Sequence, residues 1–212
     1  MDEGWHTYWS NPGDSGGPLE VSWDYPEGVI IEDVSWPTPK LIPYPPLITY
    51  GYEDEVNFVF KVFKNPSSII ENIKAKVNFL ICADICIPES ALLEIKLPLK
   101  ASQPEIEKGL ANLPSKQLKV NAYNEEEFIL IDFRHDEPIR NAYFFSDDNK
   151  FNYPEKHQLR KQSSNTYRMY LPKNHSSISS FSGVLKINDV GYFINANVAN
   201  VAINNSDSYS IS

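Results

Sequence analysis

Apolar residues recur at every second position over long stretches of this chain, and this period of two constrains its fold more than any other feature. Every second residue is apolar from Val56 to Val62, and the same holds for Ile73–Ile81 after the turn-forming segment Asn65–Ser68. A period of two places successive side chains on opposite faces of a strand, so that one face can be buried. Turn signals about every ten residues complete the pattern of an all-β protein built of antiparallel sandwiches.

Further elements are expected on both sides of one helix. The helix is predicted over Gln103–Leu113, because its apolar residues share one face and Pro104 occupies the first turn, where proline is tolerated. The segment Pro37–Pro46 holds five prolines, which excludes a central strand and predicts either an irregular surface connector or a binding loop. The other expected strands are Trp5–Trp9, Leu19–Tyr25, Val29–Trp36, Ala91–Leu97, Leu118–Tyr123, Glu127–Phe133, Ile139–Phe145, Thr166–Leu171, Gly183–Asn188 and Val190–Val198.

These elements divide the 212 residues into two immunoglobulin-like antiparallel β-sandwich domains joined by a short linker that contains the helix. Residues 1–100 are expected to form the first sandwich, 101–118 the linker and 119–203 the second sandwich. Residues 204–212 are rich in Asn and Ser and are expected to be a flexible tail. A hydrophobic content of 42% is sufficient to fill both cores.

Charge and hydropathy exclude several classes of function. The net charge of −9 argues against a nucleic-acid partner, because phosphate binding requires clustered Lys and Arg. No apolar run approaches the roughly 20 residues that a membrane-spanning helix needs, and no apolar signal-peptide segment follows Met1. The protein is therefore expected either to be cytosolic or to have its export segment outside this sequence.

The only two cysteines, Cys82 and Cys86, lie four positions apart at the end of a predicted strand. On a straight strand their Cα atoms would be about 13 Å apart, whereas a disulfide needs roughly 4.4–6.8 Å. A bond between them therefore requires the segment Ala83–Ile85 to turn. Closing so small a loop stabilises a fold little, which favours a reversible redox pair over a structural bond.

The residues alone leave two other interpretations of the cysteines open. They are inert buried thiols, or ligands of a soft copper(I) ion, which two thiolates could hold with or without His6. Zinc is not expected, because it needs further ligands and the histidines are scattered without ligand spacing. Asp84 and Glu89 are expected to raise the pKa of the thiols, which predicts a slow nucleophile that serves docked partners.

Hydrolytic chemistry finds little support. The segment Gly13–Pro18 matches the nucleophile loop of chymotrypsin-like serine proteases letter for letter. In those proteases, however, the loop follows the His and Asp of the catalytic triad. Only His6 precedes it here, so protease activity is not expected.

Four motifs follow one another in the first half of the chain. They are Gly-Trp-His-Thr-Tyr-Trp-x-Asn-Pro-Gly-Asp-Ser-Gly at Gly4–Gly16, Trp-Pro-x-Pro at Trp36–Pro39, Tyr-Gly-Tyr-Glu-x-Glu-Val at Tyr50–Val56 and Cys-x-x-x-Cys-Ile-Pro-Glu at Cys82–Glu89. In this order they resemble the N-terminal periplasmic region of the DsbD/ScsB family, the thiol:disulfide interchange and copper-sensitivity-suppressor proteins. Residues 4–98 carry the specific motifs, whereas residues 119–200 fit only the looser pattern of the second sandwich in ScsB-like members.

The resemblance implies a periplasmic electron-relay domain without a cofactor. Cys82 and Cys86 would be the redox pair, and a loop that contains Tyr50, Gly51 and Tyr52 would shield the pair and bind its partner. A membrane-embedded reductase domain, absent from this chain, would reduce the pair, which would in turn reduce periplasmic thioredoxin-like proteins. Cys86 is expected to form the mixed disulfide, because the turn should place it nearer the rim of the sandwich. The alternatives are a non-catalytic interaction or assembly module and a copper-binding domain that uses both thiols.

Overall fold

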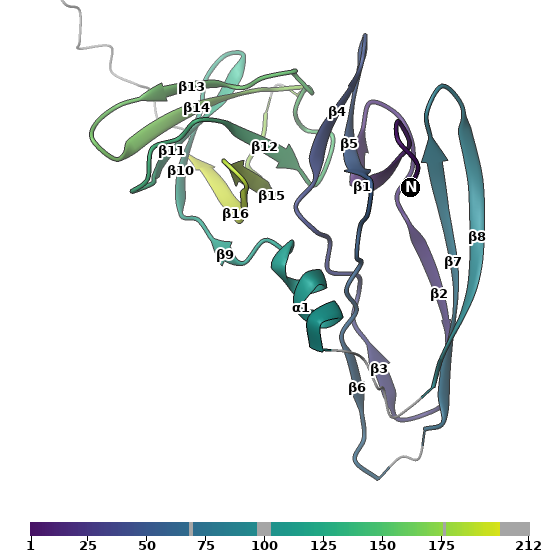
Figure 1. Ribbon diagram of the computed structural model, residues 1–212. Coiled ribbons are helices and arrows are strands. Elements are labelled where there is room, and N and C mark those ends of the chain that lie inside the picture. Colours follow the sequence, from purple (N-terminus) through teal and green to yellow (C-terminus); the bar gives the residue numbers. More distant parts are fainter. Residues whose placement is uncertain (68–69, 97–102, 176, 200–212) are drawn as a thin grey trace, which may run out of the picture.

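The strands form two separate bodies with one helix between them (Figure 1). The computed structural model describes residues 1–67, 70–96, 103–175 and 177–199. Strands β1–β8 form the first sandwich and strands β9–β16 form the second, and no sheet in the described residues contains strands from both. The prediction of an all-β protein with two sandwiches and a short helix between them is confirmed.

The first sandwich is built around a six-stranded sheet in the order β2-β7-β1-β5-β4, with β8 paired to the other edge of β7. A separate small sheet consists of β3 and β6. A cluster of buried apolar residues, Val29 of β3 with Ile70 and Ile73, forms a core of this sandwich. The strands are β1 (His6–Gly13), β2 (Glu20–Asp24), β3 (Val29–Ile31), β4 (Lys40–Tyr44), β5 (Leu47–Glu53), β6 (Val62–Lys64), β7 (Asn72–Cys82) and β8 (Cys86–Lys96).

Three segments of the first sandwich differ from the sequence-based expectation. The proline-rich segment contains β4, which pairs only with β5 and so lies at the sheet edge, where proline is tolerated. The Tyr50–Tyr52 element, expected in a loop, lies within β5. The predicted strand Val56–Val62 has only an isolated bridge between Ser35 and Val59 before β6 begins.

The second sandwich runs in the order β12-β15-β16-β10-β11-β14-β13, with β9 paired to β16. The long strand β16 is antiparallel to β15 but parallel to β10 and β9, so the sandwich is not purely antiparallel. Its core is formed by large buried side chains such as Ile131, Phe144 and Leu185. The strands are β9 (Lys116–Gln117), β10 (Val120–Asn124), β11 (Phe128–Arg134), β12 (Ala142–Ser146), β13 (Gln158–Lys161), β14 (Thr166–Pro172), β15 (Ser180–Ile187) and β16 (Val190–Ala199).

The helix α1 covers Gln103–Ala111 and ends two residues before the predicted end. It lies against the first sandwich at Gly109, where an added Cβ atom would approach Cγ2 of Val59 to 3.1 Å. Ile106 and Leu110, two of the apolar residues on one face of the helix, are 45% and 49% exposed. The predicted tail 204–212 and the start of the predicted linker at 101–102 lie outside the described residues.

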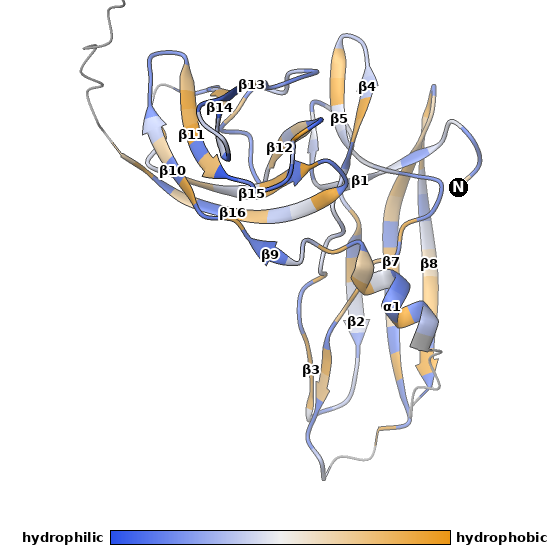
Figure 2. Cartoon of the chain, turned by 60° about the vertical axis from the view of Figure 1, so that its left-hand side comes forward, coloured by the Kyte–Doolittle hydropathy of each residue, from blue (hydrophilic) through white to orange (hydrophobic). Residues whose placement is uncertain are grey.

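Hydrophobic and hydrophilic residues alternate along the strands of both sandwiches (Figure 2). The alternation is clear at the start of β7, where Ile73 and Ala75 are buried and their neighbours Asn72, Lys74 and Lys76 are exposed. Within the described ranges, no helix is long and apolar enough to cross a membrane.

Candidate functional site

The two cysteines form a disulfide that closes the end of the β7–β8 hairpin. Cys82 is the last residue of β7, Cys86 is the first of β8, and the two are directly opposite in the antiparallel register. The segment Ala83–Ile85 makes the expected turn, in which the amide of Ala83 donates to the carbonyl of Ile85. The Cα atoms are 4.1 Å apart, slightly below the usual range for a disulfide.

The two sulfur-bearing residues differ in their access to solvent. Cys82 is 1% exposed, whereas Cys86 is exposed to solvent. Ile85 and Ile87, on either side of Cys86, are 65% and 36% exposed. A thiolate from another protein can therefore approach Cys86 over an apolar rim, while Cys82 is covered.

The register of the sheet decides which side chains lie on the same face as the disulfide. His6 of β1 is directly opposite Cys82 of β7, and paired residues point to the same face of a sheet. Tyr8, two residues further along β1, shares that face. The first strand thus brings two polar aromatic side chains to the disulfide.

Tyr8 is the aromatic residue that contacts the disulfide. Its hydroxyl lies 3.7 Å from Sγ of Cys86 and 3.3 Å from Nε2 of His6, so the three groups form a hydrogen-bonded chain. The rings of His6 and Tyr8 meet edge to face, with centroids 5.2 Å apart. Both residues belong to the Gly-Trp-His-Thr-Tyr-Trp motif. The sequence brought His6 to the thiols only in the copper(I) alternative, and it did not predict the contact of Tyr8 with Cys86.

Two glycines hold Tyr8 in place, because each leaves room that a side chain would fill. A Cβ atom at Gly16 would lie 2.2 Å from Cε1 of the Tyr8 ring, and the backbone there has φ +97°. On the other side, Gly51 of β5 is directly opposite Tyr8. A Cβ atom at Gly51 would lie 2.0 Å from the carbonyl oxygen of Thr7, so glycine permits the close approach of β1 and β5.

Burial keeps both groups beside Cys86 neutral near pH 7. Burial lowers the pKa of His6, and the nearby carboxylate of Glu53 opposes this shift only in part. Burial likewise raises the pKa of the Tyr8 phenol. A neutral phenol retains its proton and can donate a hydrogen bond to a cysteine thiolate, and the Nε2–H tautomer of His6 can donate to the phenol oxygen in turn.

The structure places Tyr50 and Tyr52 on the opposite face of the sheet from the disulfide. Tyr52 pairs with Thr7, whose side chain alternates with those of His6 and Tyr8. Tyr50 is 1% exposed and packs against Phe145, and the hydroxyl of Tyr52 donates to the carbonyl of Pro37 at 2.8 Å. In the described residues, no contact places the ring of Tyr50 or of Tyr52 at the sulfurs. Shielding of the cysteine pair by Tyr50, Gly51 and Tyr52 stays a prediction.

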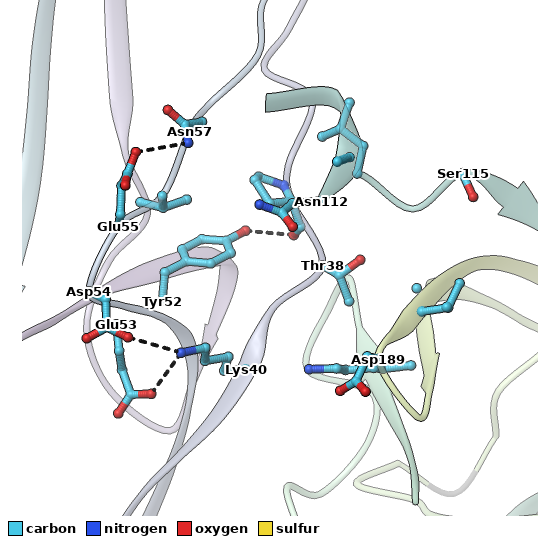
Figure 3. Close-up of a pocket in the computed structure, with 17 residues that line it drawn as sticks. Thr38, Lys40, Tyr52, Glu53, Asp54, Glu55, Asn57, Asn112, Ser115 and Asp189 are labelled. Atoms are coloured by element: carbon cyan, nitrogen blue, oxygen red, sulfur yellow. Dashed lines mark hydrogen bonds and ion pairs between the residues drawn. The ribbon is translucent and has the colours of Figure 1, made fainter. Parts of the chain in front are cut away.

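Tyr52 lines a hollow of about 340 Å³ between the two sandwiches and the end of α1 (Figure 3). Lys40 lies in the same hollow, 3.3 Å from Glu53 and 3.6 Å from Asp54, and Asp189 of the second sandwich faces it from the other side. Among the described residues, no group of three or more His, Cys, Asp or Glu side chains gathers in this hollow or elsewhere to hold a metal ion.

These features define a class of protein: a β-sandwich whose hairpin end carries a disulfide between one exposed and one buried cysteine residue. Residues 1–98 match the family model described as "Thiol:disulfide interchange protein DsbD, N-terminal". The match confirms for this part of the chain the resemblance that its four motifs predicted.

A solved structure extends the likeness to both sandwiches. The crystal structure of the N-terminal periplasmic domain of ScsB from Proteus mirabilis aligns with a TM-score of 0.71 and 18% sequence identity. The alignment covers 95% of this chain and 85% of that one. At this identity the match establishes the fold. No curated protein sequence matches the chain.

Proposed function

We propose that this chain is a periplasmic thiol:disulfide interchange module that relays electrons through Cys82 and Cys86. The observation that carries the proposal is the position of the disulfide, at an exposed hairpin end with Cys86 accessible and Cys82 buried. The family match of residues 1–98 supports the same chemistry. The location follows the ScsB relative, whose aligned part is described as periplasmic.

Reduction of the module transfers two electrons from a dithiol donor. A donor thiolate attacks Sγ of Cys86, the disulfide bond breaks, and Cys82 leaves as a thiolate that takes up a proton. The second donor thiol then attacks the donor's own sulfur in the mixed disulfide, which releases Cys86 and leaves the donor oxidised. We assign the donor role to a membrane-embedded reductase domain outside this chain.

Delivery of the electrons reverses these steps on an acceptor disulfide. The Cys86 thiolate attacks one acceptor sulfur, and the other acceptor sulfur leaves. Cys82 then attacks Cys86 in the mixed disulfide, restoring the intramolecular bond and releasing the reduced acceptor. The acceptor would be a periplasmic thioredoxin-like protein. The hydrogen bond from Tyr8 to Cys86 would raise the fraction of Cys86 present as thiolate in both directions of exchange.

The division of labour between the two sandwiches belongs to the same proposal. Residues 1–100 would be the redox domain, 101–118 the linker, and 119–203 a second domain with no cysteine of its own. The separate sheets support this division, since the described strands of the first end at Lys96 and those of the second begin at Lys116.

Equilibration with glutathione redox buffers tests the proposal. The purified protein is incubated at graded ratios of reduced to oxidised glutathione, and free thiols are counted by alkylation and mass spectrometry. We expect the Cys82–Cys86 disulfide to be reduced to the dithiol in a single two-electron transition while the protein stays folded. A disulfide that reacts only after the protein is unfolded would contradict the relay and indicate a structural bond in an interaction module. Copper(I) added to the reduced protein tests the metal alternative, because stoichiometric binding that blocks alkylation of both thiols would favour it.

A further inference from the structure

The second sandwich contacts the same strand that carries Tyr8. Trp9 follows Tyr8 in β1 and points to the opposite face of the sheet, where it is 2% exposed. Its ring lies 6.2 Å from that of Phe145, a residue of β12 in the second sandwich. Successive residues of one strand thus contact the disulfide on one face and the second sandwich on the other.

A continuous buried cluster joins the two sandwiches at this strand, and we call it the joint. Phe145 and Val184 are neighbours across β12 and β15, and both are buried against the first sandwich. Tyr50 lies between the two bodies, with its ring 4.9 Å from that of Phe145 and its hydroxyl 3.1 Å from that of Tyr143. The buried members of the joint are Trp9, Ile48, Tyr50, Tyr52, Phe145 and Val184.

Asn11, also in β1, adds a polar part to the joint. Its side-chain amide donates to the carbonyl of Ser146 at 2.8 Å and to that of Asp148 at 3.1 Å. Asn11 is 8% exposed, so these bonds are sheltered from water. Burial makes it costly to leave such donors without acceptors, and the bonds therefore fix the position of β1 relative to β12.

We propose that the second sandwich is a positioning element for the redox pair, which holds β1 so that Tyr8 reaches Cys86. The inference rests on the proposed exchange function and assigns a role to the sandwich that carries no cysteine. Trp9, Asn11 and Phe145 act through Tyr8 and touch neither sulfur.

The geometry makes the Tyr8 contact sensitive to the position of β1. The distance from the Tyr8 hydroxyl to Sγ of Cys86 is 3.7 Å, near the outer limit for a hydrogen bond to sulfur. In the described part of the chain, β1 pairs with β7 at a single position, His6 with Cys82. Few hydrogen bonds therefore hold β1 directly to β7. A small displacement of β1 toward the space vacated by a joint residue would break the Tyr8 contact while leaving the hairpin intact.

The experiment measures the reactivity of Cys86 when the joint is weakened. In a Cys82→Ser background, the alkylation rate of Cys86 by iodoacetamide is followed against pH, alone and with Asn11→Ala or Phe145→Ala. We expect each joint substitution to move the midpoint upward by about 0.5 to 1 pH unit, because the loss of one hydrogen bond to the thiolate corresponds to about a fivefold change. Ile131→Val, within the core of the second sandwich, serves as the matched control and should leave the midpoint unchanged.

A second background decides whether the effect passes through Tyr8. With Tyr8→Phe already present, the joint substitutions should cause no further shift of the midpoint. In the background that retains Tyr8, Phe145→Leu keeps most of the buried volume and should leave the midpoint nearly unchanged. An unchanged midpoint in Asn11→Ala, or equal shifts with and without Tyr8, would overturn the inference. Should Phe145→Ala fail to fold, Asn11→Ala decides alone, because it removes little volume and deletes the bonds of the Asn11 side chain to Ser146, Asp148, Tyr153 and Gly13.

Failure of the inference can be told apart from failure of the proposed function. If the wild-type disulfide does not equilibrate with glutathione, the exchange function is wrong whatever the alkylation midpoints show. If it equilibrates and the joint variants match Ile131→Val, only the positioning role is wrong.

Discussion

His6 of β1 lies directly opposite Cys82 of β7, although the two residues are 76 positions apart in the sequence. This pairing brings the first motif of the chain to the disulfide. The pairing fixes the face on which Tyr8 lies, and Tyr8 contacts Cys86 on the neighbouring strand of the hairpin. The site is therefore a property of three strands, of which only two carry the cysteines.

Removing the hydroxyl of Tyr8 should slow thiol exchange. In Tyr8→Phe the phenol no longer donates to the Cys86 thiolate, so the thiolate fraction should fall about fivefold at a pH below the thiol pKa. The remaining thiolate is more nucleophilic, so we expect the exchange rate to fall by about two- to threefold. The measurement is the reaction of the reduced protein with oxidised glutathione under pseudo-first-order conditions. Tyr52→Phe is the matched control, since it removes a buried hydroxyl from the opposite face of the same sheet. Equal rates in the two variants would refute a role for Tyr8.

A side chain at Gly51 should disturb the site through the backbone. In Gly51→Ala the new Cβ atom would lie 2.0 Å from the carbonyl oxygen of Thr7, so β1 must move away from β5. We expect a loss of about 1–3 kcal/mol in the free energy of unfolding, together with slower exchange because β1 carries Tyr8. Urea denaturation and the glutathione assay measure the two effects. Gly17→Ala, whose Cβ would meet only a Leu80 methyl group at 3.5 Å, should change neither.

Acid should destabilise the second sandwich through His157. Its Nε2 atom lies 3.1 Å from the carbonyl oxygen of Phe144, and burial lowers its pKa from 6.5 to about 4. The unfolded chain therefore binds the proton first. The contribution of neutral His157 to the free energy of unfolding should be fully present above pH 6.5. It should decrease as the pH drops toward 4, by at most about 3 kcal/mol in all.

Urea denaturation of the wild type and of His157→Gln between pH 7.5 and 4 tests this dependence. The variant should be less stable at pH 7.5 but lose less stability on acidification. His175→Gln, which alters an exposed histidine, is the control and should follow the wild type. Parallel pH curves for the wild type and His157→Gln would show that His157 does not cause the acid sensitivity.

The strands that could be predicted from the sequence are those whose alternation reflects burial on one face. Ile73–Ile81 shows such alternation and forms most of β7, and the spacing of the cysteines correctly required a turn at Ala83–Ile85. β13 is short, and only Leu159 among its residues is apolar, so no period of two marks it. β5 contains Tyr50–Tyr52, for which the family resemblance implied a loop.

The position of Tyr50 and Tyr52 could not be obtained from local pattern, because it depends on register between distant strands. A shift of one residue moves a side chain from one face of a sheet to the other. Gly51 and Tyr8 share the face of the disulfide, whereas Tyr50 and Tyr52 flank Gly51 and face the second sandwich. The aromatic contact to the sulfur that the structure shows comes from Tyr8, and a shielding role for Tyr50 and Tyr52 stays a prediction.

The most direct test of the relay is to trap its covalent intermediate and map the sulfur that carries it. Reduced Cys82→Ser and Cys86→Ser variants are each mixed with a thioredoxin-like protein that lacks its resolving cysteine and whose remaining cysteine carries thionitrobenzoate in a mixed disulfide. Attack by the variant's thiolate on the partner's sulfur then releases thionitrobenzoate and leaves the protein–protein adduct. Peptide mass spectrometry then locates any mixed disulfide. The account predicts a stable adduct at Cys86 in Cys82→Ser and little adduct in folded Cys86→Ser, because Cys82 is 1% exposed. Adduct formation at Cys82 alone, or at neither cysteine, would contradict it.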